Sequence, residues 1–172
     1  MSQVILVNEK DEVIGSMDKM QAHEEALMHR AFSIFIFNAN GKMLLQQRAD
    51  EKYHSAGLWT NACCSHPMPG EETMDAATRR LKEELGFTTA LSYKFGFTYK
   101  SGYDNGLTEH EYDHVFTGFY DGEIFPDISE VKDWKYFSLT EIHEMLKANP
   151  ENFTSWFIIA FPKLESYLAG IH

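Results

Sequence analysis

Positive charge is scarce in this sequence. Lys and Arg number 15 against 26 Asp and Glu, and the formal net charge is -11 with neutral histidines. Such a surface repels polyanions, so nucleic acid and anionic membranes are not expected as partners, whereas a small anionic ligand is compatible if cations gather locally. Long apolar runs are also missing, because none approaches the roughly 18 residues of a membrane helix, and the N-terminus has no leader pattern. We therefore expect a cytoplasmic protein.

Cysteine is scarce too, and the two that occur, Cys63 and Cys64, are neighbours in the stretch NACCSHP. Adjacent cysteines pair only through a strained ring and close no loop, which excludes a disulfide framework and suits a reducing compartment. The thiols therefore serve either packing or chemistry. Successive residues of a strand point to opposite faces, so only one of the two can face a given ligand.

The chain of 172 residues contains no repeat, low-complexity tract or flexible linker, and we predict a single domain over 1–172. Apolar alternation predicts hairpins around NEKD and ANG, and strands at LWTNACC, YKFGFTY, EYDHVFTGFY and WKYFSL. Helices are predicted over 71–85, with Gly86 as the C-terminal stop, at LTEIHEML, and at SWFIIAFPKLESYL, the last interrupted or started near Pro162. The predicted class is α+β, with mixed sheets flanked by helices.

The helix over 71–85 carries an altered motif. Its spacing follows the Nudix box, G-x5-E-x7-R-E-U-x-E-E-x-G-U with U aliphatic, at Ser65, Glu71, Arg79, Arg80, Glu83, Glu84 and Gly86. Ser65 replaces the opening glycine, and Arg80 replaces the first glutamate of the R-E pair. A simpler interpretation is that Arg79 with Glu83, and Arg80 with Glu84, form ion pairs one turn apart on a solvated helix. The helix alone favours that interpretation.

Histidines and glutamates elsewhere predict a metal site. Glu109 and Glu111 lie two apart in a predicted strand and so share a face beside apolar residues, where two carboxylates need a cation. Imidazole suits transition metals and carboxylate suits harder ones, so a mixed octahedral site for Zn, Mn or Mg is predicted with His23, His29 and His66. Any one histidine alone is more simply a surface or satisfied core residue. We assign His54, His110, His114, His143 and His172 to this class of surface or satisfied core residues.

The few basic residues include four that border these motifs, namely Lys19, Arg48, Lys52 and Arg80. Arginine forks and lysine point charges are what a diphosphate requires. The alternative is ordinary solubilising surface, which is the better interpretation of Lys10, Lys42 and Lys132.

Four stretches together carry a resemblance to a known family: NACCSHP, LMHRAFSIFIFN, LLQQRADEKYHSAGLWTN and TEHE. Almost the whole chain resembles the type I isopentenyl diphosphate isomerases, which are Nudix-fold enzymes of isoprenoid synthesis. The C-[GS]-H-P stretch and the acidic E-x-E strand separate this family from ordinary Nudix hydrolases. SWF near the C-terminus is similar to the segment of the family's active-site tryptophan. The resemblance implies interconversion of isopentenyl and dimethylallyl diphosphate by protonation and deprotonation across the double bond.

The resemblance also implies roles for individual residues. Cys64 would be the catalytic thiol and Cys63 a packing neighbour, while Tyr99 would hydrogen-bond the catalytic Glu111. One divalent metal (Mn, Zn or Mg) would be held by His23, His29, His66, Glu109 and Glu111. A Mg ion on the substrate diphosphate would be held by Glu84, with the diphosphate ligands Lys19, Arg48, Lys52 and Arg80. Trp156 would supply an electron-rich wall for a carbocation-like intermediate.

An unactivated double bond needs an acid on one face and a base on the other, and Cys64 and Glu111 are expected to form that pair. For the forward direction we favour Glu111 with Tyr99 as acid and Cys64 as base, since nearby positive charge can stabilise a thiolate. Two alternatives are a Nudix hydrolase of nucleoside diphosphate derivatives, opposed by Arg80, and an inactive Nudix-fold binding protein, which no residue supports. The sequence indicates no oligomeric state.

Overall fold

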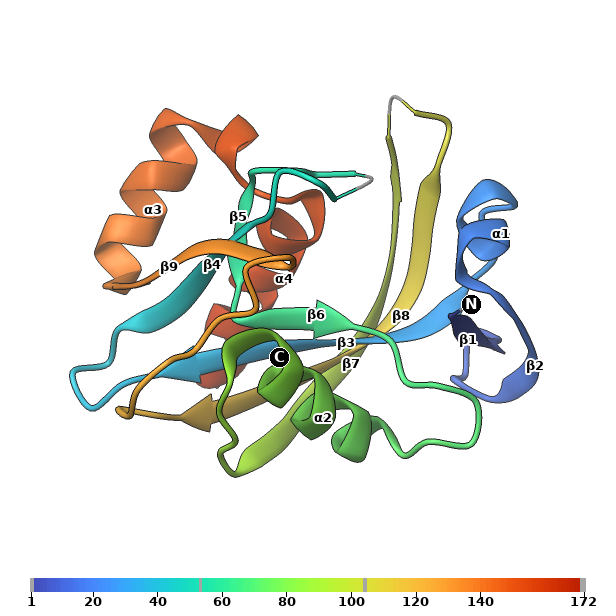
Figure 1. Ribbon diagram of the computed structural model, residues 1–172, viewed down its shortest axis with the longest axis horizontal. Coiled ribbons are helices and arrows are strands. Elements are labelled where there is room, and N and C mark those ends of the chain that lie inside the picture. Colours follow the sequence, from blue (N-terminus) through green and yellow to red (C-terminus); the bar gives the residue numbers. More distant parts are fainter. Residues whose placement is uncertain (1, 53, 104, 171–172) are drawn as a thin grey trace.

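The computed structural model describes residues 2–52, 54–103 and 105–170. Its elements are β1 (Gln3–Val7), β2 (Val13–Asp18), α1 (Lys19–Glu24), β3 (His29–Phe37), β4 (Met43–Arg48), β5 (Trp59–Asn61), β6 (Cys63–Ser65), α2 (Thr73–Leu85), β7 (Leu91–Gly102), β8 (Thr108–Phe119), β9 (Val131–Phe137), α3 (Leu139–Ala148), the 3-10 helix η1 (Pro150–Asn152) and α4 (Ser155–Leu168). This mixture confirms the predicted α+β class (Figure 1).

Strand β3 organises the sheet. It pairs in parallel with β8 along its whole length and antiparallel with β6, while β7 pairs antiparallel with β8. Strand β4 pairs with β5 and β9 instead. Since β3 and β4 are in register only at Phe37 and Met43, the two groups of strands diverge from that point (Figure 1).

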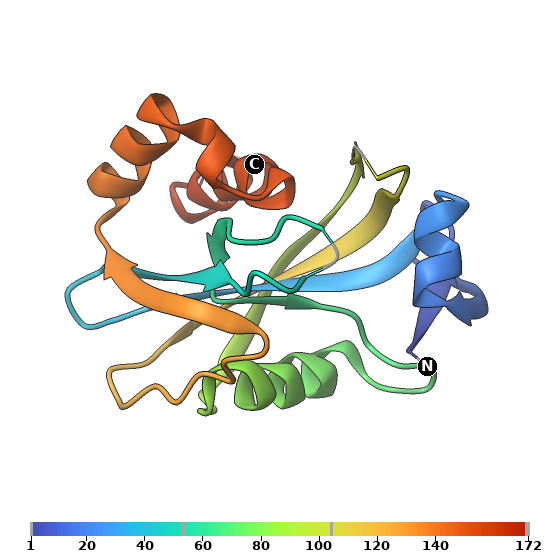
Figure 2. The same cartoon turned by 45° about the horizontal axis from the view of Figure 1, so that its top comes forward.

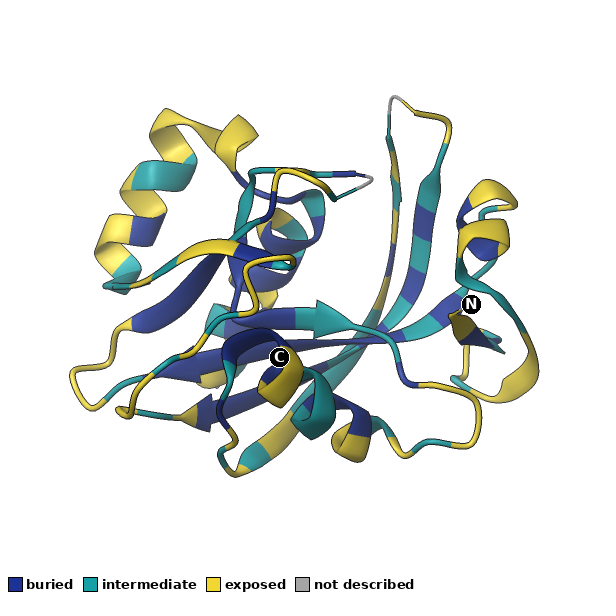
Figure 3. Ribbon diagram, viewed as in Figure 1, coloured by how far each residue is buried: buried dark blue, intermediate teal, exposed yellow. Residues whose placement is uncertain are grey.

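Side chains of β3 alternate between two hydrophobic clusters on opposite faces of the sheet. Phe32, Ile34 and Ile36 pack with α2, whereas Phe35 and Phe37 pack with α3 and α4. Figure 2 shows α2 on one side of the sheet and α3 and α4 on the other, and Figure 3 shows β3 and β4 buried between them. The odd-numbered positions of β3 therefore face α4.

Several local predictions are confirmed. The NEKD hairpin forms between β1 and β2, and α2 ends at Gly86, whose φ of 75° is the left-handed conformation that glycine adopts readily. The helix α3 begins with a capping box between Ser138 and Glu141. The short helix α1, capped by the Asp18 side chain, was not predicted.

Three local predictions need correction. The ANG segment turns as expected, but β3 and β4 separate after one pair of residues. The LWTNACC segment forms two strands, β5 and β6, which pair with different neighbours on either side of Ala62. The last helix is neither interrupted nor started at Pro162, because it begins at Ser155 and runs through the proline. Pro162 lies on the exposed side, where water can take the place of its missing amide as a partner for the carbonyl of Ile158.

Among the described residues, no helix is both long and apolar enough to cross a bilayer.

Candidate active site and metal centre

The face of the sheet that α4 covers carries the reactive side chains. In β3, His29 and Ser33 lie at odd-numbered positions, whose side chains point to this face. The parallel register places Glu111 of β8 beside His29, and the antiparallel register places Tyr99 of β7 beside Glu111. Cys64 of β6 lies opposite Ser33. Strand pairing alone therefore brings the predicted thiol, carboxylate and tyrosine to one face.

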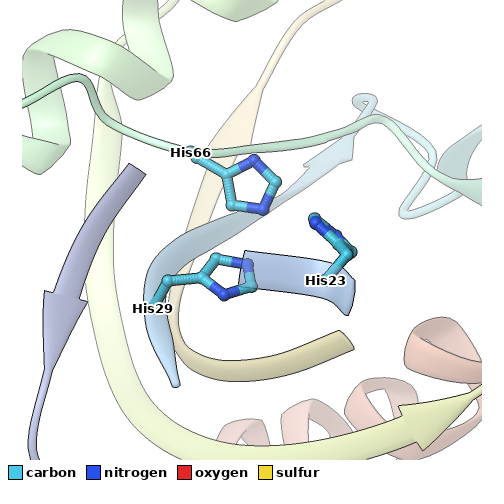
Figure 4. A group of neighbouring side chains, drawn as sticks. All are labelled: His23, His29 and His66. Atoms are coloured by element: carbon cyan, nitrogen blue, oxygen red, sulfur yellow. The ribbon is translucent and has the colours of Figure 1, made fainter. Parts of the chain in front are cut away.

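Three imidazole rings gather at one end of this face (Figure 4). His23 comes from α1, His29 from the start of β3, and His66 from the segment after β6, and their ligand atoms lie within 4.8 Å of one another. Nδ1 of His23 lies 2.6 Å from the carbonyl of Lys19, and Nδ1 of His29 lies 3.0 Å from the carbonyl of Leu27. A carbonyl only accepts, so each of these Nδ1 atoms carries a hydrogen and Nε2 is the ligand atom.

Two buried carboxylates face these rings. Oε1 of Glu109 lies 3.3 Å from Nε2 of His23. Oε2 of Glu111 lies 3.2 Å from Nε2 of His29 and 2.7 Å from Nε2 of His66. The Nε2 atoms of the imidazoles thus face the carboxylate oxygens at short distance, as the ligand atoms of one ion would.

The electrostatics of the cluster keep both carboxyl groups ionised. Burial by itself raises their pKa values, but the neighbouring imidazoles outweigh it and hold the pKa of Glu109 well below its usual range and that of Glu111 at about 2. The Tyr99 hydroxyl donates to Oε2 of Glu109 at 2.9 Å and also hydrogen-bonds Oε1 of Glu111. Burial, followed by the charges of these two carboxylates, raises the pKa of Tyr99 well above its usual value, so Tyr99 keeps its proton and acts as a hydrogen-bond donor here.

The donor set fits a divalent metal ion. Imidazole nitrogen with carboxylate oxygen is the combination that borderline divalent metals prefer. Ring tautomers fixed by backbone carbonyls, and carboxylates fixed by a tyrosine, are the second layer of contacts that metal ligands need. All five predicted ligands, His23, His29, His66, Glu109 and Glu111, contribute to this cluster.

Polar neighbours hold the Cys64 thiol. Its Sγ lies 3.0 Å from Oδ1 of Asn61 and 3.5 Å from Oγ of Ser33. The Asn61 amide nitrogen donates to two backbone carbonyls, so its oxygen is the atom that faces the thiol. Burial, followed by the charge of Asp113, raises the pKa of Cys64. Burial and the Asp113 charge therefore favour a thiol over the thiolate expected from nearby positive charge.

Asp113 is a buried carboxyl group that the sequence analysis did not identify. It lies two positions after Glu111 on the same face of β8 and accepts a hydrogen bond from Ser33 at 2.7 Å. Burial, followed by the charge of Glu111, raises its pKa well above the usual range. The alternation of Glu109, Glu111 and Asp113 is the signal that would have revealed it.

Cys63 points to the opposite side, as strand alternation predicts. It is buried in the cluster beneath α2, where its Sγ lies 3.4 Å from Oε2 of Glu84. Glu84 also accepts hydrogen bonds from the Arg80 guanidinium at 2.8 Å and from the Gln46 amide at 3.1 Å. Arg80 and Glu84 do form the one-turn ion pair of the simpler interpretation, but both line the cavity described next.

A cavity of about 720 Å³ connects the two faces. Cys64, Tyr99 and Glu111 line it together with the predicted basic residues Lys19, Arg48, Lys52 and Arg80. Arg79, which we interpreted as a surface residue, lines it as well. Glu130 pairs with two of the cations, at 2.7 Å from Nζ of Lys52 and 3.8 Å from Arg80.

Trp156 forms a buried wall of this cavity, at the start of α4. The guanidinium of Arg48 lies 5.1 Å from the centre of its ring, within cation–π range. Its indole N–H has no acceptor among the described residues. One face of the ring is thus engaged by a cation that the protein itself supplies.

His54 is a buried histidine with a polar partner, as its expected class allows, but that partner belongs to the candidate metal cluster. This buried residue places Nε2 3.0 Å from Oε1 of Glu109 and so joins the metal cluster. The other described histidines of the ordinary class make contacts outside this cluster: His110 with the backbone carbonyl of Ala26, His114 with Asp11, and His143 with Glu165. His172 lies outside the described residues.

Comparison with known proteins identifies a family match. Residues 27–157 match the NUDIX domain. The isopentenyl-diphosphate Delta-isomerase of Pectobacterium atrosepticum is 48% identical over 169 residues, which cover 97% of this chain and 93% of that protein. Isopentenyl-diphosphate Delta-isomerase 1 of Aromatoleum aromaticum is 50% identical over 154 residues, covering 90% and 87%.

Solved structures share the fold at low identity. The DR0079 protein of Deinococcus radiodurans superimposes with a TM-score of 0.71 at 16% identity, covering 86% of this chain and 90% of that one. The MutT protein of Methanosarcina mazei gives a TM-score of 0.67 at 19% identity, covering 80% and 93%.

Proposed function

This chain belongs to the NUDIX domain family and, within it, to the isopentenyl-diphosphate Delta-isomerases. We propose that it binds isopentenyl diphosphate between Cys64 and Glu111, and that these two residues shift the double bond within the substrate. One observation carries the proposal. The Cys64 thiol and the Glu111–Tyr99 pair open onto the same cavity, which is also lined by a group of cations. A small substrate with an apolar tail and an anionic head fits both groups at once.

The cations would hold the diphosphate. Lys52 and Arg80 are paired with Glu130 in the free protein, so they would exchange this carboxylate for substrate oxygens. Lys19 and Arg48 line the same cavity and would complete the set. We assign Glu84 as the protein ligand of a Mg ion on the diphosphate. That role requires Glu84 to leave Arg80, which now contacts it.

The reacting carbons would lie between Sγ of Cys64 and the Glu111 carboxylate. Cys64 holds its proton toward Asn61, and Glu111 is ionised and hydrogen-bonded by Tyr99. From these states, the thiol would protonate the terminal carbon of the double bond, and Glu111 would remove a proton from the allylic carbon. This reverses the assignment that residue types favoured, in which Glu111 with Tyr99 is the acid.

A divalent metal, when bound by the His and Glu cluster, supplies fixed positive charge beside Glu111 and lowers the proton affinity of its carboxylate. Trp156 lines the cavity as a buried apolar wall and would keep water away from the intermediate. We further propose that the whole chain acts as a single domain in the cytoplasm, where the free thiols of Cys63 and Cys64 would stay reduced.

Incubation with isopentenyl diphosphate and Mg in deuterated water tests the reaction. We expect dimethylallyl diphosphate that carries solvent deuterium, with no released phosphate, since protonation draws on exchangeable hydrogens. Release of phosphate or a monophosphate without deuterium in the carbon skeleton would instead indicate a hydrolase. A binding protein would give neither product.

The assignment of acid and base has its own test. The ¹³Cβ resonance of Cys64 differs between thiol and thiolate, and it can be recorded with metal and the saturated analogue isopentyl diphosphate bound. A thiol signal supports Cys64 as the acid in the forward direction. A thiolate signal would restore Glu111 with Tyr99 in that role.

A further inference from the structure

His54 lies in the connection between β4 and β5, and its side chain turns inward to the metal cluster. Its Nε2 approaches Oε1 of Glu109 to 3.0 Å. The same carboxylate oxygen lies 3.3 Å from Nε2 of His23. The ligand atoms of His23, His54 and Glu109 all lie within 4.8 Å of one another. Two imidazoles therefore flank the oxygen of Glu109 that faces the cluster.

Surrounding residues hold the His54 ring in this orientation. The ring stacks on Tyr103 with centroids 4.6 Å apart and planes 6° from parallel. The ring also meets the edge of Trp156, at 5.8 Å between centroids and 82° between planes. The backbone carbonyl of His54 accepts a hydrogen bond from Arg48 at 3.2 Å. Contacts from three parts of the chain thus aim Nε2, which is the preorganisation expected of a metal ligand.

We propose that His54 is a sixth protein ligand of the metal, bound through Nε2. The inference rests on the metal site of the proposed function, whose five residues leave one position of an octahedron to be filled. With His54 in place, four imidazoles and two carboxylates would surround the ion. A metal with only protein ligands has no open position for water or substrate, which is the arrangement of structural rather than catalytic sites.

This coordination would couple the metal to substrate binding. The segment that ends at His54 also carries Arg48 and Lys52, both of which line the cavity. Binding of the metal by His54 would fix this segment over the cavity before the substrate arrives. The metal would then organise the diphosphate site without touching the diphosphate.

The test uses Co(II) as the probe, because its visible absorption is weak in six-coordinate and stronger in five-coordinate sites. His54→Phe keeps an aromatic ring against Tyr103 and Trp156 but removes the nitrogen. His66→Ala removes one of the five ligands of the underlying site. His143→Ala is the matched control, since this exposed histidine pairs with Glu165 on the surface. Circular dichroism of each metal-free variant verifies that it is folded.

We expect His54→Phe to weaken Co(II) binding by about 10- to 100-fold and to change its visible spectrum, because an open position or a water oxygen would replace an imidazole nitrogen, with His143→Ala unchanged. Weaker binding with an unchanged spectrum would overturn the proposal, because His54 would then only hydrogen-bond Glu109 from outside. Wild-type affinity and spectrum in His54→Phe would overturn it too. If His66→Ala still lost Co(II) in that case, the five-residue site would stand, whereas failure of the wild type to bind Co(II) would remove both.

Discussion

The two ends of the cavity are organised differently. At the metal end, imidazoles and carboxylates are buried, and Tyr99 and backbone carbonyls fix their orientations. At the cationic end, Lys52 and Arg80 are partly exposed and bound to Glu130. The first end is preorganised, whereas the second must exchange partners when substrate binds. We therefore expect substitutions at the metal end to act on kcat and metal content, and those at the cationic end to act on KM.

The largest effect should come from the thiol that faces the cavity. Cys64→Ala removes one of the two groups proposed to transfer protons, so kcat should fall by about 10²- to 10⁴-fold. The matched variant Cys63→Ala changes a buried thiol of the α2 cluster and should keep most activity while lowering the free energy of unfolding by about 1 kcal/mol. Steady-state kinetics and denaturant unfolding measure both. Equal loss of kcat in the two variants would contradict the assignment.

Metal removal should have the next largest effect. Without a cation, Glu109 and Glu111 are buried close together with only imidazoles to compensate their charge. Adding back the metal at 100 to 1,000 times its Kd should stabilise the fold by about 3 to 4 kcal/mol. Calorimetry of the chelated and reloaded protein measures this difference. The His66→Ala variant should lose most of the response, and a wild-type response in that variant would exclude His66 as a ligand.

A smaller effect is expected at the cationic end. Glu130→Gln releases Lys52 and Arg80 from their carboxylate partner, so the diphosphate no longer competes with it. KM should fall about 2- to 5-fold with kcat unchanged, as suits a partly exposed ion pair worth about 0.5 to 1 kcal/mol. Arg80→Ala should raise KM instead. A fall in kcat for Glu130→Gln would show that the two ends are not separable.

The smallest effect should come from Glu71, which lies just before α2 and pairs with Arg79. Hydrogen bonds from Arg79 lower the pKa of Glu71. A depressed pKa stabilises the fold above the unfolded-state value and loses that contribution as the pH falls through the folded-state value. Glu71→Gln should therefore cost a few tenths of a kcal/mol at neutral pH, as expected of a solvent-screened pair, and nothing in acid. Thermal unfolding at the two pH values measures it, and an equal cost at both would refute the ionic origin.

Period-two alternation predicted much of the site. It places Glu109 and Glu111 on one face and separates Cys63 from Cys64, because neighbouring residues of a strand point apart. The same rule applied one step further would have included Asp113. The histidines His23, His29 and His66 were proposed as the remaining ligands from residue type, and the resemblance to a family implied the same three.

The position of His54 could not be predicted in this way. The connection between β4 and β5 has no periodicity, and it folds back through left-handed conformations at Ser55, with φ of 55°, and Gly57, with φ of 73°. Tertiary contacts decide where such a segment lies. The divergence of β3 from β4 was likewise hidden, because a hairpin turn indicates how two strands begin to pair and not where they part.

The parallel pairing of β3 with β8 has a consequence for biosynthesis. The contact between His29 and Glu111 joins positions 82 residues apart, so the metal ligands on β3 have no carboxylate partner until β8 has been translated. Parallel strands of this kind pair late, because a long loop must close first. A nascent chain that ends before β8 would therefore have the three histidines without the carboxylates of the proposed site. Metal uptake by the proposed site would therefore wait until β8 has been made and has paired with β3.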